Sequence, residues 1–210
     1  MTRSSQVEAQ YALGMVNLTR IYTRTGDAGE TRLGDMSVTA KTDPRLEAYA
    51  TTDEAGAAIG VALAHAAADG GIDDHVVALL TVVQNDLFDV GADLSTPVVP
   101  DPAYPPLRVE QSYVDRLEQW CDHYNEPLEK LRSFILSGGT VAAAHLHVAR
   151  TVVRRAERAA WAAYAVHGET MNPLALTYLN RLSDLLFILA RHANREHGDV
   201  LWVPGGEREA

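Results

Sequence analysis

Residues 141–167 of the chain read VAAAHLHVARTVVRRAERAAWAAYAVH, and this stretch decides the fold. Thr140, directly before it, is a suitable helix N-cap, and apolar side chains recur along one side at helical spacing. At about 1.5 Å per residue, a helix of this length spans roughly 40 Å. The stretch therefore predicts one long amphipathic helix.

Four further segments carry helix signals. Asp43-Pro44 and Asn172-Pro173 each place a capping side chain before a proline at the first helical position, and Asp73 is a third capping residue. Apolar residues at helical spacing follow each of these starts. The predicted helices cover residues 45–68, 73–90, 109–125 and 174–196.

The segments between these helices carry turn and loop signals. Five prolines between residues 95 and 107 exclude a regular element there, and residues 1–42 are rich in Thr, Gly, Ser and Arg without an apolar period. No stretch alternates with period two for long. We therefore predict an all-α fold in a single domain, residues 1–210. It comprises an irregular N-terminal arm (1–42), a five-helix bundle (43–197) and a C-terminal tail (198–210).

Composition excludes several classes of protein. Hydrophobic residues make up 47% of the 210 residues, too many for a disordered chain, and the formal net charge is −10. Because phosphate contacts dominate nucleic-acid binding, an acidic chain is a poor partner for DNA or RNA. The arginine-rich stretch 150–158 is a local exception that suits a small polyanion.

The single cysteine, Cys121, excludes an intramolecular disulfide framework and fits a reducing compartment. The first fifteen residues lack the apolar core of a signal peptide. No stretch approaches the roughly 18 uninterrupted apolar residues of a transmembrane helix. We therefore expect a soluble cytoplasmic protein that does not bind a membrane.

The long helix carries a stripe of arginines. Arg150, Arg154 and Arg158 are spaced i, i+4, i+8 and so lie along one side, with Glu157 as the only nearby acid. Such a run is often only a solvated face, but guanidinium groups without carboxylates also suit phosphate recognition. Arg155 points toward the apolar side, where it needs a partner.

The arm holds a second candidate site, TRTGDAGETR at residues 23–32. Glycines and hydroxyl residues let backbone N–H groups gather around an anion, although such a segment is equally typical of a turn or a disordered terminus. It is not a Walker A loop, because no Gly-Lys-Ser or Gly-Lys-Thr occurs in the chain. Its glycine spacing also differs from the dinucleotide-binding fingerprint.

Two further groups of polar residues lie among apolar ones. Residues 180–184, NRLSD, stand between leucines, so some of them either link helices inside the bundle or face a ligand. The pair Asp53 and Glu54 lies among alanines, where an arginine of the long helix is the natural partner and a solvated pair is the alternative.

The chain brings no strong nucleophile or metal site of its own. His145 and His147 are two residues apart and point to different sides of a helix. Cys121 has no Lys or Arg within four positions to lower its pKa, and no Gly-x-Ser-x-Gly elbow occurs.

Taken together, these motifs resemble the PduO-type ATP:cob(I)alamin adenosyltransferases. The resemblance covers roughly residues 20–195, with the motifs in the same order. The chain departs from the family pattern at Arg24, where a lysine is common in the family, and in its proline-rich connector, residues 95–107. The residues that carry it are TRTGDAGET at 23–31, Lys41, TTDE at 51–54, Phe134 before SGGT at 137–140, ARTVVRRAER at 149–158, and NRLSD at 180–184.

The resemblance implies an architecture and an activity. Members of this family are homotrimers of five-helix bundles that bind ATP at subunit interfaces. They transfer the 5′-deoxyadenosyl group of ATP to the cobalt of cob(I)alamin, forming adenosylcobalamin and releasing triphosphate. The implied ligands are ATP with Mg²⁺ and cobalamin, and no metal ligand from the protein is expected because ATP carries the Mg²⁺.

The resemblance also implies roles for individual residues, carried over by motif matching. The residues implied to wrap ATP from one subunit are Thr23, Arg24, Thr25, Gly26, Thr31, Arg32 and Lys41. Those implied to bind ATP from the neighbour are Arg154, Arg155, Glu157, Arg158 and Asn180. The implied catalytic residues are Arg154, Phe134 and Asn180.

Phe134 is implied to press against the lower face of the corrin and exclude the axial ligand, with Phe187 lining the same side. Asp53 is implied to pair with Arg150 across the subunit interface. Since Co(I) is the nucleophile, the protein needs none. The alternative is a non-catalytic nucleotide-binding module or a chaperone that delivers adenosylcobalamin. A reductase and an adenosylcobalamin-dependent enzyme are the protein partners implied.

Overall fold

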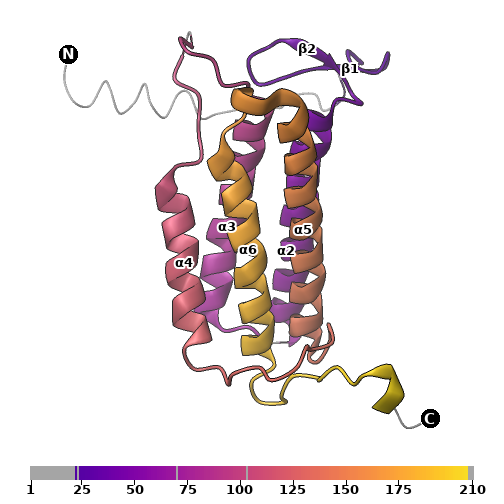
Figure 1. Cartoon of the computed structure of the whole chain (residues 1–210), viewed down its shortest axis with the longest axis vertical. Helices are drawn as coiled ribbons and strands as arrows, with labels where there is room; N and C mark the ends of the chain where they lie inside the picture. The colour runs from indigo at the N-terminus through magenta and orange to yellow at the C-terminus, as the bar shows by residue number, and fades with distance from the viewer. Residues whose placement is uncertain (1–21, 23, 70, 103, 208–210) are drawn as a thin grey trace, which may run out of the picture.

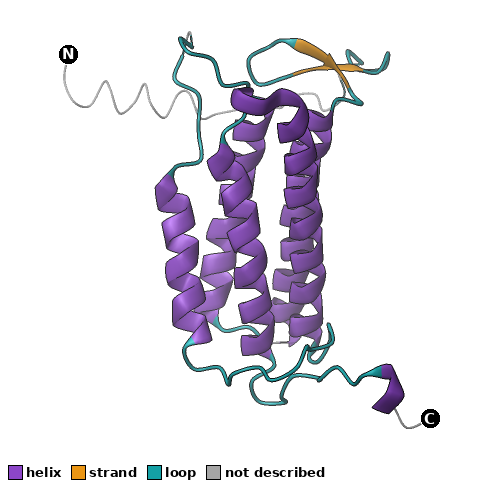
Figure 2. Ribbon diagram, viewed as in Figure 1, coloured by secondary structure: helices purple, strands orange, loops and turns teal. Residues whose placement is uncertain are grey.

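The computed structural model describes residues 22, 24–69, 71–102 and 104–207 (Figure 1). Long helices lie side by side, and consecutive helices run in opposite directions (Figures 1 and 2). They are α2 (Pro44–Asp69), α3 (Asp74–Ser95), α4 (Gln111–Asn125), α5 (Val141–His167) and α6 (Pro173–Ala193). We call the end of the bundle near the α5–α6 junction the arm end, and the opposite end, with residues 127–140 and the tail, the tail end.

The predicted all-α bundle is confirmed, and the capping signals explain where its helices begin. The Thr140 hydroxyl accepts a hydrogen bond from the Ala143 N–H (3.2 Å), and an Asp73 carboxylate oxygen accepts one from the Val76 N–H (3.0 Å). Two predicted ends were wrong. α3 continues five residues further, to Ser95, and α6 ends at Ala193 because Asn194 caps it.

The sequence predicted an irregular arm, but part of the arm forms regular structure. Strands β1 (Glu30–Arg32) and β2 (Val38–Ala40) form an antiparallel hairpin in which Thr31 pairs with Thr39. Three residues per strand are too few to show a period of two in the sequence. In the turn, the Asp35 carboxylate accepts from the N–H and the hydroxyl of Ser37 (3.0 and 2.6 Å).

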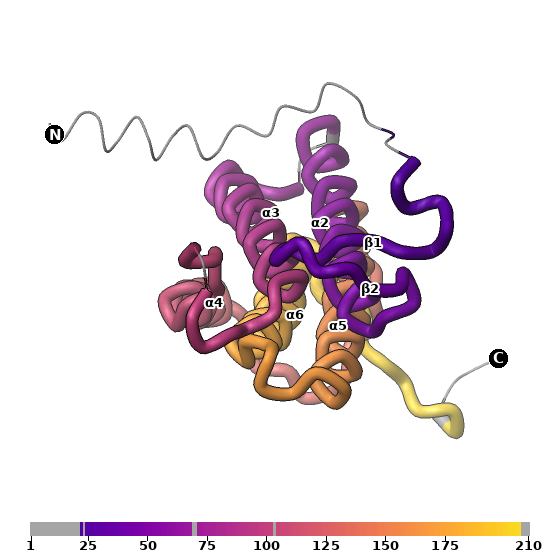
Figure 3. The backbone as a smooth tube through the Cα atoms, turned by 90° about the horizontal axis from the view of Figure 1, so that it is seen from above, coloured from indigo at the N-terminus to yellow at the C-terminus, as the bar shows by residue number. Residues whose placement is uncertain are grey.

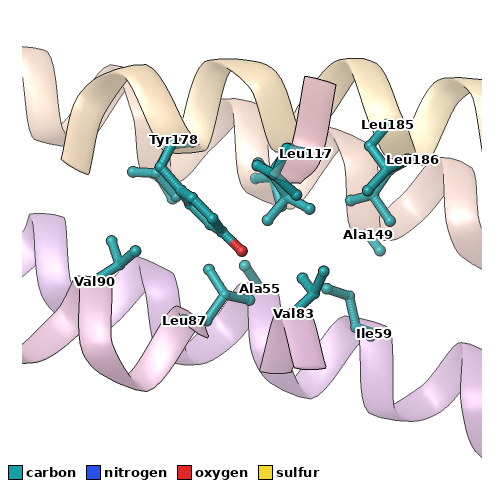
Figure 4. Packing of buried hydrophobic residues seen from close by; sticks show 14 of the residues in the cluster. Ala55, Ile59, Val83, Leu87, Val90, Leu117, Ala149, Tyr178, Leu185 and Leu186 are labelled. Atoms are coloured by element: carbon teal, nitrogen blue, oxygen red, sulfur yellow. The ribbon is translucent and has the colours of Figure 1, made fainter. Parts of the chain in front are cut away.

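One hydrophobic core joins the helices (Figure 4). α5 packs against both α2 and α6, while α4 lies on the outside of the bundle against α6 (Figure 3). By length and composition α6 alone among the described helices passes for a membrane span, but 56% of its most apolar window is buried inside the bundle. Burial in the core accounts for that apolar character.

Candidate active site

The arm is fastened to the arm end of the bundle through Asp43. Its carboxylate accepts hydrogen bonds from the Thr39 hydroxyl of β2, the Arg45 N–H and the His167 ring at the end of α5, each at 2.8 Å. Burial alone would raise the pKa of Asp43, but these hydrogen bonds outweigh burial and lower it. The hairpin is therefore held against both α2 and α5.

Within the arm, Lys41 and Gly26, which the resemblance implies to be ATP-binding residues, lie together. A Cβ at position 26 would lie 2.9 Å from the Lys41 Nζ, so the ammonium group folds directly over the glycine. The Lys41 N–H donates to the Gly29 carbonyl (2.8 Å), and the Arg32 guanidinium donates to the Met36 carbonyl (3.0 Å). Thr23 lies outside the described residues.

A cavity of about 850 Å³ opens beside the arm, between α2 and α3. Arg32 of the arm and Asp53 of α2 line it, together with many small side chains and the exposed Phe88. Asp53 makes no hydrogen bond or ion pair with any residue of the described chain. This cavity thus combines a basic arm residue with an unpaired carboxylate.

A second group of predicted residues lies on the other side of α5, facing α6. The Asn180 amide donates to the Glu157 carboxylate (3.0 Å), which joins the two helices. Arg154 and Arg158 are exposed and make no hydrogen bond or ion pair within the described chain. A cleft of about 280 Å³ runs from Arg154 to Phe187. Arg154 and Arg158 of the arginine stripe are therefore available to a ligand.

Arg155 does not belong to the apolar side of α5, where the sequence had placed it. Its side chain is 54% exposed and forms an ion pair with Glu54 of α2. The helix turns Arg155 toward α2, whose Glu54 supplies the carboxylate. The prediction that an arginine of the long helix partners the Asp53–Glu54 pair is thereby confirmed for Glu54.

Phe187 lies between two basic side chains of α5. The Arg150 guanidinium lies 5.9 Å from the centre of its ring, and the His147 ring meets it edge-on at 6.1 Å. His147 is only 2% exposed, and neither ring nitrogen has a partner among the described residues. Burial, together with the charge of Arg150, lowers the pKa of His147, so the ring is neutral at pH 7.

At the tail end, Phe134 is 79% exposed and lies beside Trp202, with the ring centres 6.1 Å apart. The tail pairs with this segment: the Trp202 N–H donates to the Phe134 carbonyl (2.8 Å), and the Leu136 N–H donates to the Val200 carbonyl (2.7 Å). The tail thus places an aromatic side chain next to Phe134.

The turn after Phe134 is fixed from α6. The Asn194 side chain accepts from the Thr140 N–H (2.9 Å) and donates to the Gly138 carbonyl (3.1 Å). Gly139 has φ +99°, and a Cβ there would collide with Asn194. The Arg150 guanidinium reaches the same turn at the Ser137 hydroxyl (3.3 Å).

The structure therefore sorts the predicted residues into groups on different faces of one chain. Arg32 lines the cavity with residues of α2 and α3, whereas Arg154 lines the cleft with residues of α6. The described residues also contain no cluster of three or more His, Cys, Asp or Glu that could hold a metal ion. Burial, with a smaller contribution from Asp184, raises the pKa of Cys121 to about 11, which keeps the thiol protonated.

Residues 21–193 match the family model described as cobalamin adenosyltransferase. The chain belongs to this family. Among curated relatives, the corrinoid adenosyltransferase of Mycobacterium tuberculosis (strain ATCC 25618 / H37Rv) is 64% identical over 195 residues, which cover 93% of this chain and 98% of that protein. The corrinoid adenosyltransferase of Bacillus subtilis (strain 168) is 40% identical over 182 residues, covering 85% and 89%.

Solved structures of the same family share the fold. A variant of the PduO-type ATP:corrinoid adenosyltransferase from Lactobacillus reuteri, complexed with cobalamin and ATP, matches with a TM-score of 0.76 and 35% identity. The match covers 87% of this chain and 96% of that one. The predicted membership of the cobalamin adenosyltransferase family is confirmed.

Sequence reasoning did not single out several residues that shape this family member's site. His147 was considered and rejected as a metal ligand, and its burial without partners had no signal in the sequence. Ser137 and Asn194 were not recognised as the partners that hold the turn after Phe134. Ser137 contacts Arg150, 13 residues away, and Asn194 contacts Thr140, 54 residues away. Helical spacing does not predict contacts of this kind.

Proposed function

We propose that this protein is an ATP:corrinoid adenosyltransferase, which moves the 5′-deoxyadenosyl group of ATP to cob(I)alamin. The observation that carries the proposal is the pair of exposed, unpaired guanidinium groups of Arg154 and Arg158 beside the Glu157–Asn180 contact. Planar donors on a rigid helix suit a polyphosphate. Membership of the cobalamin adenosyltransferase family supports the same activity.

The active assembly we propose is a homotrimer. The arm with the α2–α3 cavity and the α5–α6 face lie on different sides of one chain, so a complete site needs two copies. Contacts between unlike faces close into a ring when the rotation allows. In such a ring the exposed, unpaired Asp53 of one copy meets Arg150 of the next.

In this assembly the arm closes over ATP from one side and α5 with α6 hold it from the other. Lys41 over Gly26 and the Arg32 guanidinium bring positive charge to the phosphates, and Arg155 shares its charge between Glu54 and the ligand. The arm residues proposed are Thr23, Arg24, Thr25, Gly26, Thr31, Arg32 and Lys41. The proposed residues of the neighbour are Arg154, Arg155, Glu157, Arg158 and Asn180.

The chemistry needs no nucleophile from the protein. The electron pair on Co(I) attacks C5′ of ATP, the Co–C bond forms, and the C5′–O bond breaks with its electrons leaving on triphosphate. Arg154 and the Mg²⁺ that ATP carries offset the charge that develops on the leaving group. Asn180 and Glu157 hold the nucleoside, so that C5′ stays close to cobalt.

Phe134 serves the reduction that precedes this step. Its ring is exposed at the tail end, where an apolar aromatic side chain can displace an axial donor from the lower face of the corrin without replacing it. Losing that donor lowers the energy of the cobalt orbital that receives the electron. Phe187, held between Arg150 and His147, lines the same side.

The reaction places the protein in a reducing compartment, and we assign it to the cytoplasm, in agreement with the single cysteine of the chain. A reductase supplies the electron and an adenosylcobalamin-dependent enzyme receives the product. The alternative, a non-catalytic nucleotide-binding module or a delivery chaperone, gives no reason for an exposed aromatic ring at position 134.

The test is to mix chemically reduced cob(I)alamin with MgATP and follow the corrin spectrum. We expect wild-type protein to form adenosylcobalamin. Arg154→Ala should weaken ATP binding by roughly 1.5–3 kcal/mol, the scale of hydrogen bonds to charged groups. The more conservative Arg154→Lys should recover part of this loss. An unchanged spectrum with wild type, or an active monomer in sedimentation, contradicts the proposal.

A further inference from the structure

A cavity of about 930 Å³ lies at the tail end and is not used by any role assigned above. It is bounded by residues 127–132, the last turn of α6 and the start of the tail. Four basic side chains and two carboxylates line it, in a chain whose formal net charge is −10. They are Lys130, Arg132, Arg191 and Arg195, with Glu129 and Asp199.

The cations of this tail-end cavity differ in how they are held. Arg191 is 7% exposed and fixed by the Asp199 carboxylate (2.8 Å) and the Glu129 carbonyl (2.7 Å). Lys130 and Arg132 are exposed and make no hydrogen bond or ion pair with any residue of the described chain. Arg195, the fourth, contacts the His192 ring (2.8 Å). The cavity therefore has two cations that are held by the chain, Arg191 and Arg195, and two that are free to meet an anion.

The cavity shares its wall with the segment that carries Phe134. Arg132 precedes Phe134 by two residues, about 7 Å along an extended chain. Leu201 lines the cavity and also forms the bridge with Ile135, next to Phe134. A ligand group that reaches past Phe134 on its lower side therefore meets these cations.

Cobalamin carries such a group. Its lower base is tied to the rim of the corrin by a nucleotide loop that contains a phosphodiester, and the tie persists when the base leaves cobalt. We propose that the tail-end cavity binds this displaced nucleotide loop, with Lys130 and Arg132 pairing with its phosphodiester. The inference rests on the proposed function, because it requires Phe134 to occupy the lower face of the corrin.

The size and charge of the cavity agree with this ligand. Small-molecule sites generally measure about 300–1,000 Å³, so the cavity has room for a nucleotide. The four cations and two carboxylates of the lining give it a formal charge of +2, which suits a phosphodiester that bears one negative charge. A net acidic protein would otherwise repel this part of its substrate, and the local basic lining removes that penalty.

Cobinamide, which lacks the nucleotide loop, provides the test. The KM of wild type and of the double variant Lys130→Gln, Arg132→Gln is measured for cob(I)alamin and for cob(I)inamide, with ATP saturating. We expect the double variant to raise the KM for cob(I)alamin about tenfold and that for cob(I)inamide less than about twofold. Glu126→Gln, an exposed charge change outside the cavity lining, should alter neither.

The outcomes separate this inference from the function beneath it. If wild type adenosylates neither corrinoid, both proposals fail. If wild type is active and the double variant changes both KM values equally, or neither, only the nucleotide-loop site fails. Released triphosphate is another possible anion. If it were the ligand, the double variant would relieve product inhibition by triphosphate equally with both corrinoids, which overturns the assignment.

Discussion

The two ends of the bundle differ in how completely their buried polar groups are hydrogen-bonded. At the arm end, Asp93 is 1% exposed and accepts from the Arg108 guanidinium, the Val109 N–H and the Asn172 amide. Arg45, also 1% exposed, donates to the Leu94 carbonyl and the Thr170 hydroxyl. Each of these charged groups is satisfied by the chain itself.

At the tail end, comparable side chains keep individual polar atoms unpaired. Of the six buried side-chain atoms without a partner in the described chain, five belong to His147, Arg150, His192 and Asp199. An aromatic ring, that of Phe134, also stands exposed there. Since an unpaired buried polar atom costs about 1–3 kcal/mol, the tail end carries a cost that the arm end avoids, and this difference fits the ligand site proposed at the tail end.

The largest effect is expected at the arm end. Asp93→Ala removes the carboxylate that pairs with the Arg108 guanidinium and leaves the Val109 N–H without its acceptor, while Arg108 keeps its backbone carbonyl partners. It should therefore lower the free energy of unfolding by about 3–5 kcal/mol. Urea denaturation of the purified protein measures this loss. Asp101→Ala, an exposed carboxylate in the adjoining connector, is the control and should cost under about 0.5 kcal/mol. Equal losses of unfolding free energy in Asp93→Ala and Asp101→Ala would show that the hydrogen bonds of Asp93 do not stabilise the arm end.

At the tail end, Phe134→Ala should affect chemistry rather than stability. The ring is 79% exposed, so the free energy of unfolding should change by under about 0.5 kcal/mol. The affinity for ATP should stay nearly the same. Adenosylation of cob(II)alamin with a reductant should fall on the order of tenfold more than that of preformed cob(I)alamin, about 1.4 kcal/mol in barrier. Tyr104→Ala removes an equally exposed arm-end aromatic and should change neither rate. Equal losses with both corrinoids would argue against the role of Phe134.

A smaller gain is expected from His147→Leu. Both ring nitrogens are buried without partners, and an apolar side chain of similar size removes that cost, so the ligand-free protein should gain about 1 kcal/mol in thermal unfolding. His145→Leu, two residues earlier on a more exposed side of α5, should change stability less. A loss of stability in His147→Leu would mean that the imidazole has a hydrogen-bond partner. The buried polar atoms of the tail end would then be hydrogen-bonded more completely than we infer.

The smallest effect concerns pH at the arm. The pKa of Asp43 is lowered from 3.8, so its carboxylate contributes stability above that value and loses it as pH falls through the lower folded value. Wild type should therefore lose up to about 1 kcal/mol on acidification below about pH 4, and Asp43→Asn should lose less over the same interval. Unfolding free energies measured between pH 3 and 7 decide this. If unfolding free energy changes with pH equally in wild type and Asp43→Asn, Asp43 does not anchor the arm.

Much of the bundle could be predicted because its signals are local. Caps at Thr140, Asp73 and Asn172 act within a few residues, and the apolar side chains recur at helical spacing in the predicted helices. The hairpin of the arm was missed because each strand has three residues and is stabilised by Asp43 and His167, which lie outside it.

The candidate site was only partly accessible to the same reasoning. The spacing of Arg154 and Arg158 was enough to place them on one exposed stripe. The partner of Arg155 could not be fixed, because it depends on how α2 packs against α5. The contact of Trp202 with Phe134 joins segments 68 residues apart and leaves no trace in either local sequence.

The pairing of residues 200–202 with residues 134–136 bears on how the protein is handled in the laboratory. An affinity tag fused after residue 210 would follow within a few residues the segment 200–202 that contacts Phe134. Truncation before Val200 would strip away the neighbour of that ring. Tagged and shortened proteins therefore need to be compared with untagged protein of residues 1–210 before any rate is interpreted.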